Sequence, residues 1–420
     1  MADATIQMPR RATPLDRADA RAAARELRRR KLRAFLFVVP LLAFVLFAFV
    51  APIASMLFRS AWNPTVAELV PETLDVLRDW DGEALPDRAV LTRFAGDLKR
   101  LANDRTSGRL AEELNRAIPG TSSVVKSTAR ALRRVDDAEI AANGADLLLQ
   151  ANDAWGEPAT WRALRKVGRV YTTGYYLTAL DLETDRDGAI VARDTQIYLK
   201  LYGKTLWMAF VITVLTLILG YPLAYVMANA RPATANLLMV FVLLPFWTSL
   251  LVRTTAWIAL LQTNGVVNST LMALGLADRP LEMLYTQFST IVAMTHILLP
   301  FMVLPLYSVM RGIDPSYMRA AMSMGSRPIP AFLRIYLPMS LPGLSAGALL
   351  VFIISVGYYI TPALVGGTDG QMISNIIAFH MQQSNNWELA AALGSLLLFL
   401  ILALYWLYDR FVGAGNIKLG

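Results

Sequence analysis

The chain has 420 residues, 55% of them hydrophobic, and carries a formal net charge of +8. Soluble domains are usually about 45–50% apolar, so the excess favours a membrane protein. Cysteine is absent, which excludes disulfides, thiolate metal sites and cysteine nucleophiles. The only histidines, His296 and His380, lack the spacing of a zinc-ligand pair. We therefore predict no catalytic residue and no metal site.

The first 33 residues form a basic segment that we expect on the cytoplasmic side. They hold ten Lys or Arg against four Asp or Glu and lead directly into an apolar run at 34–58. Positive charge beside a membrane span favours the inner side of the membrane. A cleavable signal has a shorter core and a shorter lead, so the run predicts a first transmembrane helix that stays in the chain as an anchor.

Residues 59–204 form a charged but nearly neutral insert, with 20 Lys or Arg against 22 Asp or Glu over 59–203. Apolar residues at helical spacing predict amphipathic helices, one of them after Asp87. Further helices are expected to be capped at Ser122-Ser123 and at Thr160. The segment is long enough for a small domain, and we predict a mainly helical, periplasmic one without catalytic residues.

A fragment at the end of this insert resembles the tail of a phosphate-binding loop. Gly203, Lys204 and Thr205 match its last positions, but the glycine required five residues before Gly203 is Tyr198. The sequence that follows is a membrane span. Any ATP that powers the protein is therefore expected on another chain.

Five further apolar runs are long enough to cross a bilayer, which takes about 20 residues. They lie at 205–227, 237–261, 289–310, 343–364 and 389–408. With the N-terminus inside, the cytoplasmic pieces hold 17 Lys or Arg and the two short outside loops hold one. This bias places both termini in the cytoplasm. The predicted fold class is an all-α polytopic membrane protein with six transmembrane helices.

The segment between the fourth and fifth runs, 311–342, predicts a cytoplasmic elbow. Asp314 can cap a helix with Pro315 at its first position. Gly325 fits the position just past the end of that helix, and a second short helix is expected at 330–336. Such an elbow suits docking into a groove of a cytoplasmic partner, although a simple connection between two spans would look the same.

The spacing of residues in this elbow resembles the EAA loop of binding-protein-dependent ABC-transporter permeases. The matching positions are Ala320, Ala321, Gly325, Ile335, Leu337 and Pro338. Arg319 stands where the family has glutamate, so the contact of that glutamate is in doubt. Two stretches, LLPFWTSLLVRTTAWIALLQTNGVVN at 243–268 and YYITPALVGG at 358–367, resemble the polyamine/opine/phosphonate (spermidine/putrescine-like) branch.

This resemblance implies a type I importer fold in a bacterial inner membrane, with 205–420 as the permease core. The elbow, including Tyr317, would be the coupling loop that receives the movement of an ATPase. The implied partners are a second permease subunit, two copies of a cytoplasmic ATPase that bind ATP and Mg, a periplasmic solute-binding protein, and the bilayer. The solute would be a polyamine or a related small amine, opine or phosphonate compound. The chain itself would bind no cofactor and no nucleic acid, and the insert is not part of the usual family pattern.

Five residues in or beside the spans are candidates for the translocation pathway. Arg253 is costly within a membrane, by about 2.5–3.5 kcal/mol near the centre of a span, and is expected to face a cavity, a partner chain or the lipid headgroups. His296 could serve the pathway or a structural hydrogen bond. Tyr358 and Tyr359 could stack on a cationic solute or simply pack. The fifth candidate is Trp247, within the third run.

Two other classes of protein remain to be weighed. A membrane receptor would use the insert to sense a ligand, but the sequence after residue 408 is too short for a signalling domain. An ion-coupled transporter would be expected to carry an inverted repeat and acidic residues inside its spans. No Asp or Glu lies well inside any predicted span, since Glu388 and Asp409 stand at the ends of the sixth.

Overall fold

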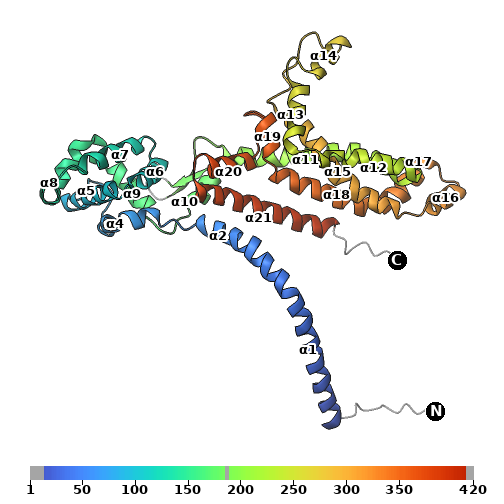
Figure 1. Cartoon of the computed structure of the whole chain (residues 1–420), viewed down its shortest axis with the longest axis horizontal. Coiled ribbons are helices and arrows are strands. Elements are labelled where there is room, and N and C mark those ends of the chain that lie inside the picture. Colours follow the sequence, from blue (N-terminus) through green and yellow to red (C-terminus); the bar gives the residue numbers. More distant parts are fainter. Residues whose placement is uncertain (1–13, 185–188, 413–420) are drawn as a thin grey trace. The chain divides into compact units, whose positions relative to one another are not determined.

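The computed structural model of the chain describes residues 14–184 and 189–412, and nearly all of the regular structure there is helical (Figure 1). Contacts divide the chain into two units, residues 1–58 and 59–420. Among the described residues, five helices are long and apolar enough to cross a membrane, and a bent pair makes a possible sixth. The predicted all-α polytopic fold class is confirmed.

The first unit is one long helix. It runs as α1 (Pro14–Val45), passes through the π-helical turn η1 (Leu46–Val50) and continues as α2 (Ala51–Arg59). The part from Glu26 to Arg59 qualifies as a membrane span, and its side chains are almost all exposed. Exposed apolar side chains over such a length fit contact with lipid, as expected for the run at 34–58.

The insert is helical with one small hairpin. Its helices are α3 (Thr65–Leu69), α4 (Pro71–Leu77), α5 (Arg88–Asn103), α6 (Ser107–Ala117), α7 (Thr121–Leu132), α8 (Asp137–Ala151), the 3-10 turn η2 (Asp153–Gly156), α9 (Pro158–Val167) and α10 (Gly174–Ala179). The strands β1 (Leu182–Thr184) and β2 (Ile190–Ala192) pair antiparallel, a hairpin that the sequence analysis did not predict.

Three aromatic side chains form the centre of the insert's own hydrophobic core. The rings of Phe94, Trp155 and Trp161 lie 5.1 to 6.0 Å apart, and all three side chains are fully buried. Both indole N–H groups are satisfied, since Trp155 donates to Thr128 Oγ1 and Trp161 donates to the carbonyl of Trp155, each at 2.9 Å. A buried indole needs such a partner, so these bonds fix both rings.

Two predicted helix starts in the insert are wrong by two or three residues. The helix expected to be capped at Ser122-Ser123 is α7, which begins at Thr121 after Gly120, whose φ of +94° favours glycine. Thr160 lies inside α9 because Pro158 already occupies the first helical turn, where its fixed φ favours a helix start.

The two ends of the insert meet. The N–H of Asn63 donates to the carbonyl of Val170 at 2.8 Å, and the N–H of Thr172 donates to the carbonyl of Ala61 at 2.9 Å. The two ends of the segment 64–169 therefore lie side by side.

A charged network joins the insert to the transport core. Arg116 on α6 donates to Glu113 Oε1 at 2.6 Å and to the carbonyl of Asn385 at 2.8 Å, and its guanidinium lies 3.5 Å from Glu388. Asn63 donates to Glu113 Oε2 at 3.2 Å. Arg116 thus holds one carboxylate of the insert and another at the start of the last span.

Burial governs the protonation of this network. Burial raises the pKa of Glu113 above its ordinary 4.5, and Glu388 adds to this, while Arg116 and Asn63 oppose it. Burial also raises the pKa of Tyr175, which accepts a hydrogen bond from Asn63, to about 12. Glu113 therefore keeps a proton to higher pH in the folded protein than in the unfolded chain.

The transport core is built around α15 (Gln287–Arg311), which packs against α11 (Tyr198–Asn229) and α18 (Leu337–Gly357) (Figure 1). Two glycines of α18, four residues apart, allow the close approach. A Cβ atom at Gly343 would lie 2.9 Å from the Pro305 carbonyl oxygen, and one at Gly347 would lie 3.0 Å from Met302 Sδ. Small residues at this spacing let membrane helices pack backbone to backbone.

The third predicted span, at 237–261, is not one straight helix. It is broken into α12 (Pro232–Trp247) and α13 (Leu250–Leu261), and α13 leads into α14 (Val266–Ala273); the two parts meet at 98°. Thr248 is extended, and Ser249 caps α13 by accepting from Val252 N–H at 3.2 Å. Pro245 removes a backbone donor just before the break.

The fifth predicted span, at 343–364, is shifted toward the elbow. The apolar helix runs from Pro328 to Gly357, through α17 (Pro328–Ala331), the π-helical turn η3 (Phe332–Tyr336) and α18. The expected separate helix at 330–336 is therefore the first part of this span, because the wider π turn accommodates Pro338 without ending the helix.

After Gly357 the chain folds back into an outer layer made of α19 (Ile360–Val365) and α20 (Ile373–Gln382). Ser289 Oγ on α15 donates to the Val365 carbonyl at 2.7 Å, and Ile373 N–H donates to Thr205 Oγ1 on α11 at 2.8 Å. The last helix, α21 (Trp387–Val412), packs against α10 and α20.

We expect Gly343→Leu to destabilise the core by about 1–3 kcal/mol, because the added side chain has no room against α15. The midpoint of thermal unfolding of the purified chain in detergent measures this. Gly394→Leu on α21 is the control, since a Cβ atom there meets nothing within 4 Å. Equal midpoints for the two variants would contradict the close approach.

We expect Glu113→Gln to change how stability depends on pH. A raised pKa means that Glu113 stabilises the folded protein fully below pH 4.5, and that this contribution is lost as the pH rises through the folded-state pKa. The variant lacks that loss, so its unfolding midpoint should gain on that of the wild type as the pH rises from 4.5 toward neutrality. Glu112→Gln, on the exposed side of α6, should track the wild type. A constant difference between Glu113→Gln and wild type would exclude the effect.

Candidate functional site

The helix of the elbow begins one residue later than the sequence predicts. It is α16 (Ser316–Ser323), with Pro315 as its N-cap, and Asp314 Oδ1 accepts from Ser316 N–H at 2.7 Å just before it. This hydrogen bond lowers the pKa of Asp314, and the nearby Arg319 adds to the effect. Arg319 itself is exposed and belongs to no ion pair among the described residues.

Gly325 ends α16 in a left-handed conformation, with φ +90°. Its N–H donates to the Met322 carbonyl at 3.0 Å, and Ser326 N–H donates to the Ala321 carbonyl at 3.1 Å. These two bonds form a Schellman cap, which satisfies the last carbonyls of a helix. A Cβ atom at Gly325 would meet nothing within 4 Å, so the glycine is required by its conformation and not by space.

The elbow carries an exposed apolar face. Five large hydrophobic side chains within seventeen positions are between 43% and 82% exposed; they are Tyr317, Met322, Met324, Ile329 and Leu333. Ala320 is exposed beside them, whereas Ala321 is buried and Met318 packs into the core. Ala321 and Met318 therefore anchor α16 to the bundle.

An aromatic cluster ties this elbow to the bundle. Tyr225 on α11 packs edge to face against Phe332 and Tyr336 of η3, at 5.6 and 5.1 Å, and Tyr221 donates to or accepts from Ser340 at 2.8 Å. The sequence analysis missed this cluster. Aromatic residues four positions apart on each of two helices were the available signal.

The other predicted elbow residues lie at the base of the same structure. Ile335 and Leu337 are half-buried, and Pro338 is exposed at the start of α18. All eight positions named from the sequence thus fall on one continuous segment from α16 to the first turn of α18.

Three of the predicted pathway residues come together at the opposite end of α15. Arg253 on α13 lies close enough to His296 on α15 and to Tyr358 after α18 to interact with both electrostatically. His296 also accepts a hydrogen bond from Trp257 Nε1, at 3.3 Å, and the two rings meet edge to face. Trp257 was missed by the sequence analysis, although it stands one helical turn after Arg253.

This site contains polar atoms that lack a partner. Arg253 Nε and Ser355 Oγ are buried and make no hydrogen bond among the described residues. Buried polar atoms are normally bonded, so these two atoms are unusual for a packed interior. Tyr359 is 38% exposed, and Trp247 is 69% exposed where α12 ends; neither joins the cluster. No group of His, Asp or Glu able to hold a metal occurs in the part of the chain that the structure describes.

The comparisons with known proteins bear on these two sites. Residues 220–413 match the family model described as a binding-protein-dependent transport system inner membrane component. This stretch includes the elbow and the Arg253 cluster and leaves out the insert.

Curated relatives match over about half of the chain. The spermidine/putrescine transport system permease protein PotB of Haemophilus influenzae is 33% identical over 220 residues, which are 51% of this chain and 77% of the relative. The inner membrane ABC transporter permease protein YdcU of Escherichia coli is 32% identical, over 50% of this chain and 71% of the relative.

Among solved structures, a chain of a bacterial ABC transporter that imports alginate matches with a TM-score of 0.41 and 19% identity, over 52% of this chain and 81% of that one. A TM-score this low does not identify the family. The family model and the permease relatives do identify it. This chain is a multi-pass inner-membrane protein that belongs to the family of inner membrane components of binding-protein-dependent transport systems.

Proposed function

We propose that the chain is a permease subunit of an ATP-driven, binding-protein-dependent importer for polyamines or related small amine, opine or phosphonate solutes. The permease relatives whose names specify spermidine and putrescine support this class of solute. Family membership sets aside the receptor that the insert alone could suggest.

The elbow is the observation that carries the proposal. Its apolar face begins on α16, which belongs to neither a membrane span nor the insert, and continues onto the first turns of the apolar helix that starts at Pro328. Large exposed apolar patches mark interaction sites. The aromatic cluster of Tyr225, Phe332 and Tyr336 fixes it to α11 and α18. A push on α16 would therefore pass into two of the helices that form the core.

ATP and Mg belong, in this proposal, to two copies of a separate cytoplasmic ATPase that docks on the elbow. The one fragment resembling a phosphate-binding loop, at Gly203-Lys204, lies inside α11, where no loop is free to wrap a phosphate. The chain thus transmits the effect of ATP binding without taking part in the chemistry.

The charge bias of the loops supports an orientation with both termini and the elbow in the cytoplasm and the insert in the periplasm. The solute-binding protein would then meet the insert and the outer layer, at the end of the core where Arg253 and His296 lie.

Gly325→Leu tests the elbow. A non-glycine residue in this left-handed conformation costs about 1–2 kcal/mol, so the end of α16 should distort while the spans stay inserted. In proteoliposomes that contain the complete transporter, we expect solute uptake and ATPase stimulation by the loaded binding protein to fall severalfold.

Gly325→Asn is the matched control, because asparagine tolerates this conformation far better than leucine does. It should retain most of the uptake. Loss of uptake by both variants to the same extent, or by neither, would remove the conformational argument for the elbow.

Arg253 bears on the second permease subunit. Its guanidinium is half-buried with an unbonded Nε, and a charge in such a place requires an opposite charge. The spans of this chain supply none, since their only acidic residues stand at the ends. A cationic polyamine cannot supply it either, whereas an opine or phosphonate solute carries an anionic group that could. For a polyamine importer we therefore assign the missing carboxylate to a partner permease that is a different chain and not a second copy of this one.

Arg253→Met separates the two roles of this charge. In the isolated chain the variant should unfold at a higher temperature than wild type, because it removes an unpaired buried charge. In the complex it should lose the partner permease on purification, because breaking a buried ion pair costs about 3–5 kcal/mol.

Arg231→Met, which removes an exposed arginine just before α12, should change neither result. An isolated chain that is destabilised by Arg253→Met would show that the arginine is already paired within it. Assembly with a second copy of this chain alone would contradict the assignment of a different partner.

A further inference from the structure

The near-neutral total charge of the insert conceals a separation of charge. A groove of about 600 Å³ lies between α6, α9, α10 and the β1–β2 hairpin. Its charged lining residues are five bases and two acids, Arg116, Arg162, Lys166, Arg169, Arg193, Glu113 and Glu183. Total charge alone argues against electrostatic attraction of a partner, but the groove is strongly basic.

Three of the five bases are committed to other contacts. Arg116 holds Glu113 and Glu388. Arg162 donates to the Gly82 carbonyl at 2.8 Å. Arg193 lies 3.5 Å from Glu183. These contacts shape the wall of the groove and neutralise both acids.

Lys166 and Arg169 remain, at the end of α9 and just after it. Both side chains are exposed, and within residues 14–184 and 189–412 neither has an ion pair or a side-chain hydrogen bond. Among the described residues, two positive charges are thus unpaired at the rim of a groove whose described acids are already paired.

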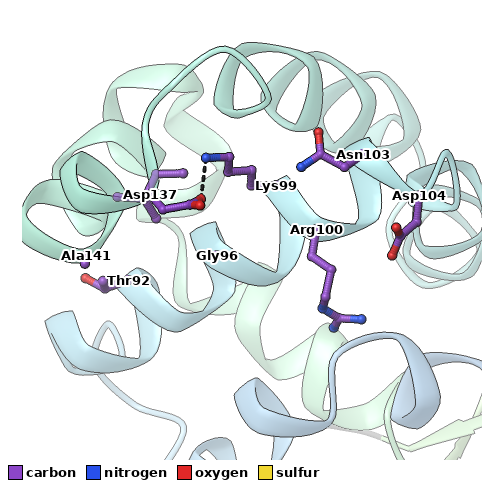
Figure 2. A pocket seen from close by; sticks show the side chains of 9 residues that line it. Thr92, Gly96, Lys99, Arg100, Asn103, Asp104, Asp137 and Ala141 are labelled. Atoms are coloured by element: carbon purple, nitrogen blue, oxygen red, sulfur yellow. Dashed lines mark hydrogen bonds and ion pairs between the residues drawn. The ribbon is translucent and has the colours of Figure 1, made fainter.

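A second hollow in the insert shows that this arrangement is not general. The hollow between α5 and α8, of about 490 Å³, is lined by Lys99, Arg100, Asp104 and Asp137 (Figure 2). Lys99 points at Asp137 and pairs with it, and Arg100 pairs with Asp97. Its charges balance, and both of its bases are paired within the chain, so it offers no unpaired positive charge to an acidic partner.

The basic groove is also connected to the transport core. Its lining includes Asn63, Glu113, Arg116 and Tyr175, the residues of the network that reaches Asn385 and Glu388 before and at the start of α21. Apolar lining residues such as Ile118, Val167 and Leu182 add a surface that a peptide side chain could cover. An occupant of the groove would therefore contact the same rigid network that holds the last span.

We propose that this groove binds an acidic surface segment of the solute-binding protein, with Lys166 and Arg169 as the charges that attract it. The inference rests on the proposed function, since it requires a binding protein at the outer end of the core. Opposite charges across an interface mainly raise the rate of association and fix orientation, so the groove would set how readily the binding protein docks.

The test uses the double variant Lys166→Glu/Arg169→Glu in the complete transporter, reconstituted in nanodiscs of neutral lipid. ATP hydrolysis is measured against the concentration of loaded binding protein, at low and at high ionic strength. The concentration for half-maximal stimulation should rise about tenfold at low ionic strength, and the difference from wild type should shrink at high ionic strength because salt screens exposed charges.

The matched control is Lys126→Glu/Arg130→Glu, which reverses two exposed charges at the same kind of spacing on α7, outside the groove. It should behave as wild type. If both double variants shift the curve equally, the groove has no special role and only the total charge matters, which overturns the proposal.

Two further outcomes also overturn it. A difference that appears only when the nanodiscs contain anionic lipid would assign the groove to lipid headgroups. If the curve for Lys166→Glu/Arg169→Glu is unshifted while the wild type is stimulated normally, the proposal for the groove is overturned and the proposed function is not affected. Absence of any stimulation of the wild-type transporter would count against the proposed function itself, so the two failures are distinguishable.

Discussion

The transport core depends on how closely α18 can approach α15. Hydrophobic attraction contributes little between helices that are already in lipid, so packing and hydrogen bonds must hold them together. Gly343 and Gly347 remove the side chains that would keep the two backbones apart. On the other side, Gly220 of α11 lets Met302 of α15 come equally near. Because these glycines lack side chains, α11 and α18 can both pack closely against α15.

Both candidate sites of the core follow from this arrangement. At one end, α18, which carries Gly343, continues backwards through η3 into the elbow, so the elbow is an extension of a packed helix and not a loose loop. At the other end, Ser289 and Thr290 of α15 donate to carbonyls of the segment that folds back after Gly357. In the proposed function, a displacement of the elbow would pass through α18 to α15 and so to the neighbourhood of His296.

The sequence predicted the parts whose signals are local. The glycine at 325 and four of the six apolar runs depend on residues a few positions apart, and the structure has them, with α16 starting one residue later than predicted. Breaks within the apolar helices were harder to predict from the sequence. Pro245 and Ser249 mark the bend between α12 and α13, but the surrounding run is so apolar that its length outweighed them. At Pro338 the error was the opposite one. The sequence analysis expected a short helix that ends at residue 336, but the π turn η3 continues without a break into α18.

The site at Arg253 was partly visible in the sequence. A charged residue inside an apolar run stands out, and so does a lone histidine, but nothing in the sequence states that the two lie together. Their meeting depends on the 98° bend that turns α13 toward α15. The groove on the insert was not visible at all, because summing charge over a segment removes the information about which face carries it.

The paired ends of the insert have a consequence for how the protein is made. Residues 61–63 and 170–172 lie side by side, and the aromatic core of the insert is built entirely from residues between them. Residues 64–169 can therefore complete this core before α11 leaves the ribosome, whereas α10, the last helix of the insert, packs against α21 and must wait for it. The later docking of residues 64–169 through Arg116 would join two already folded parts, and a chain that lost residues 64–169 would still present the same two ends to the membrane helices on either side.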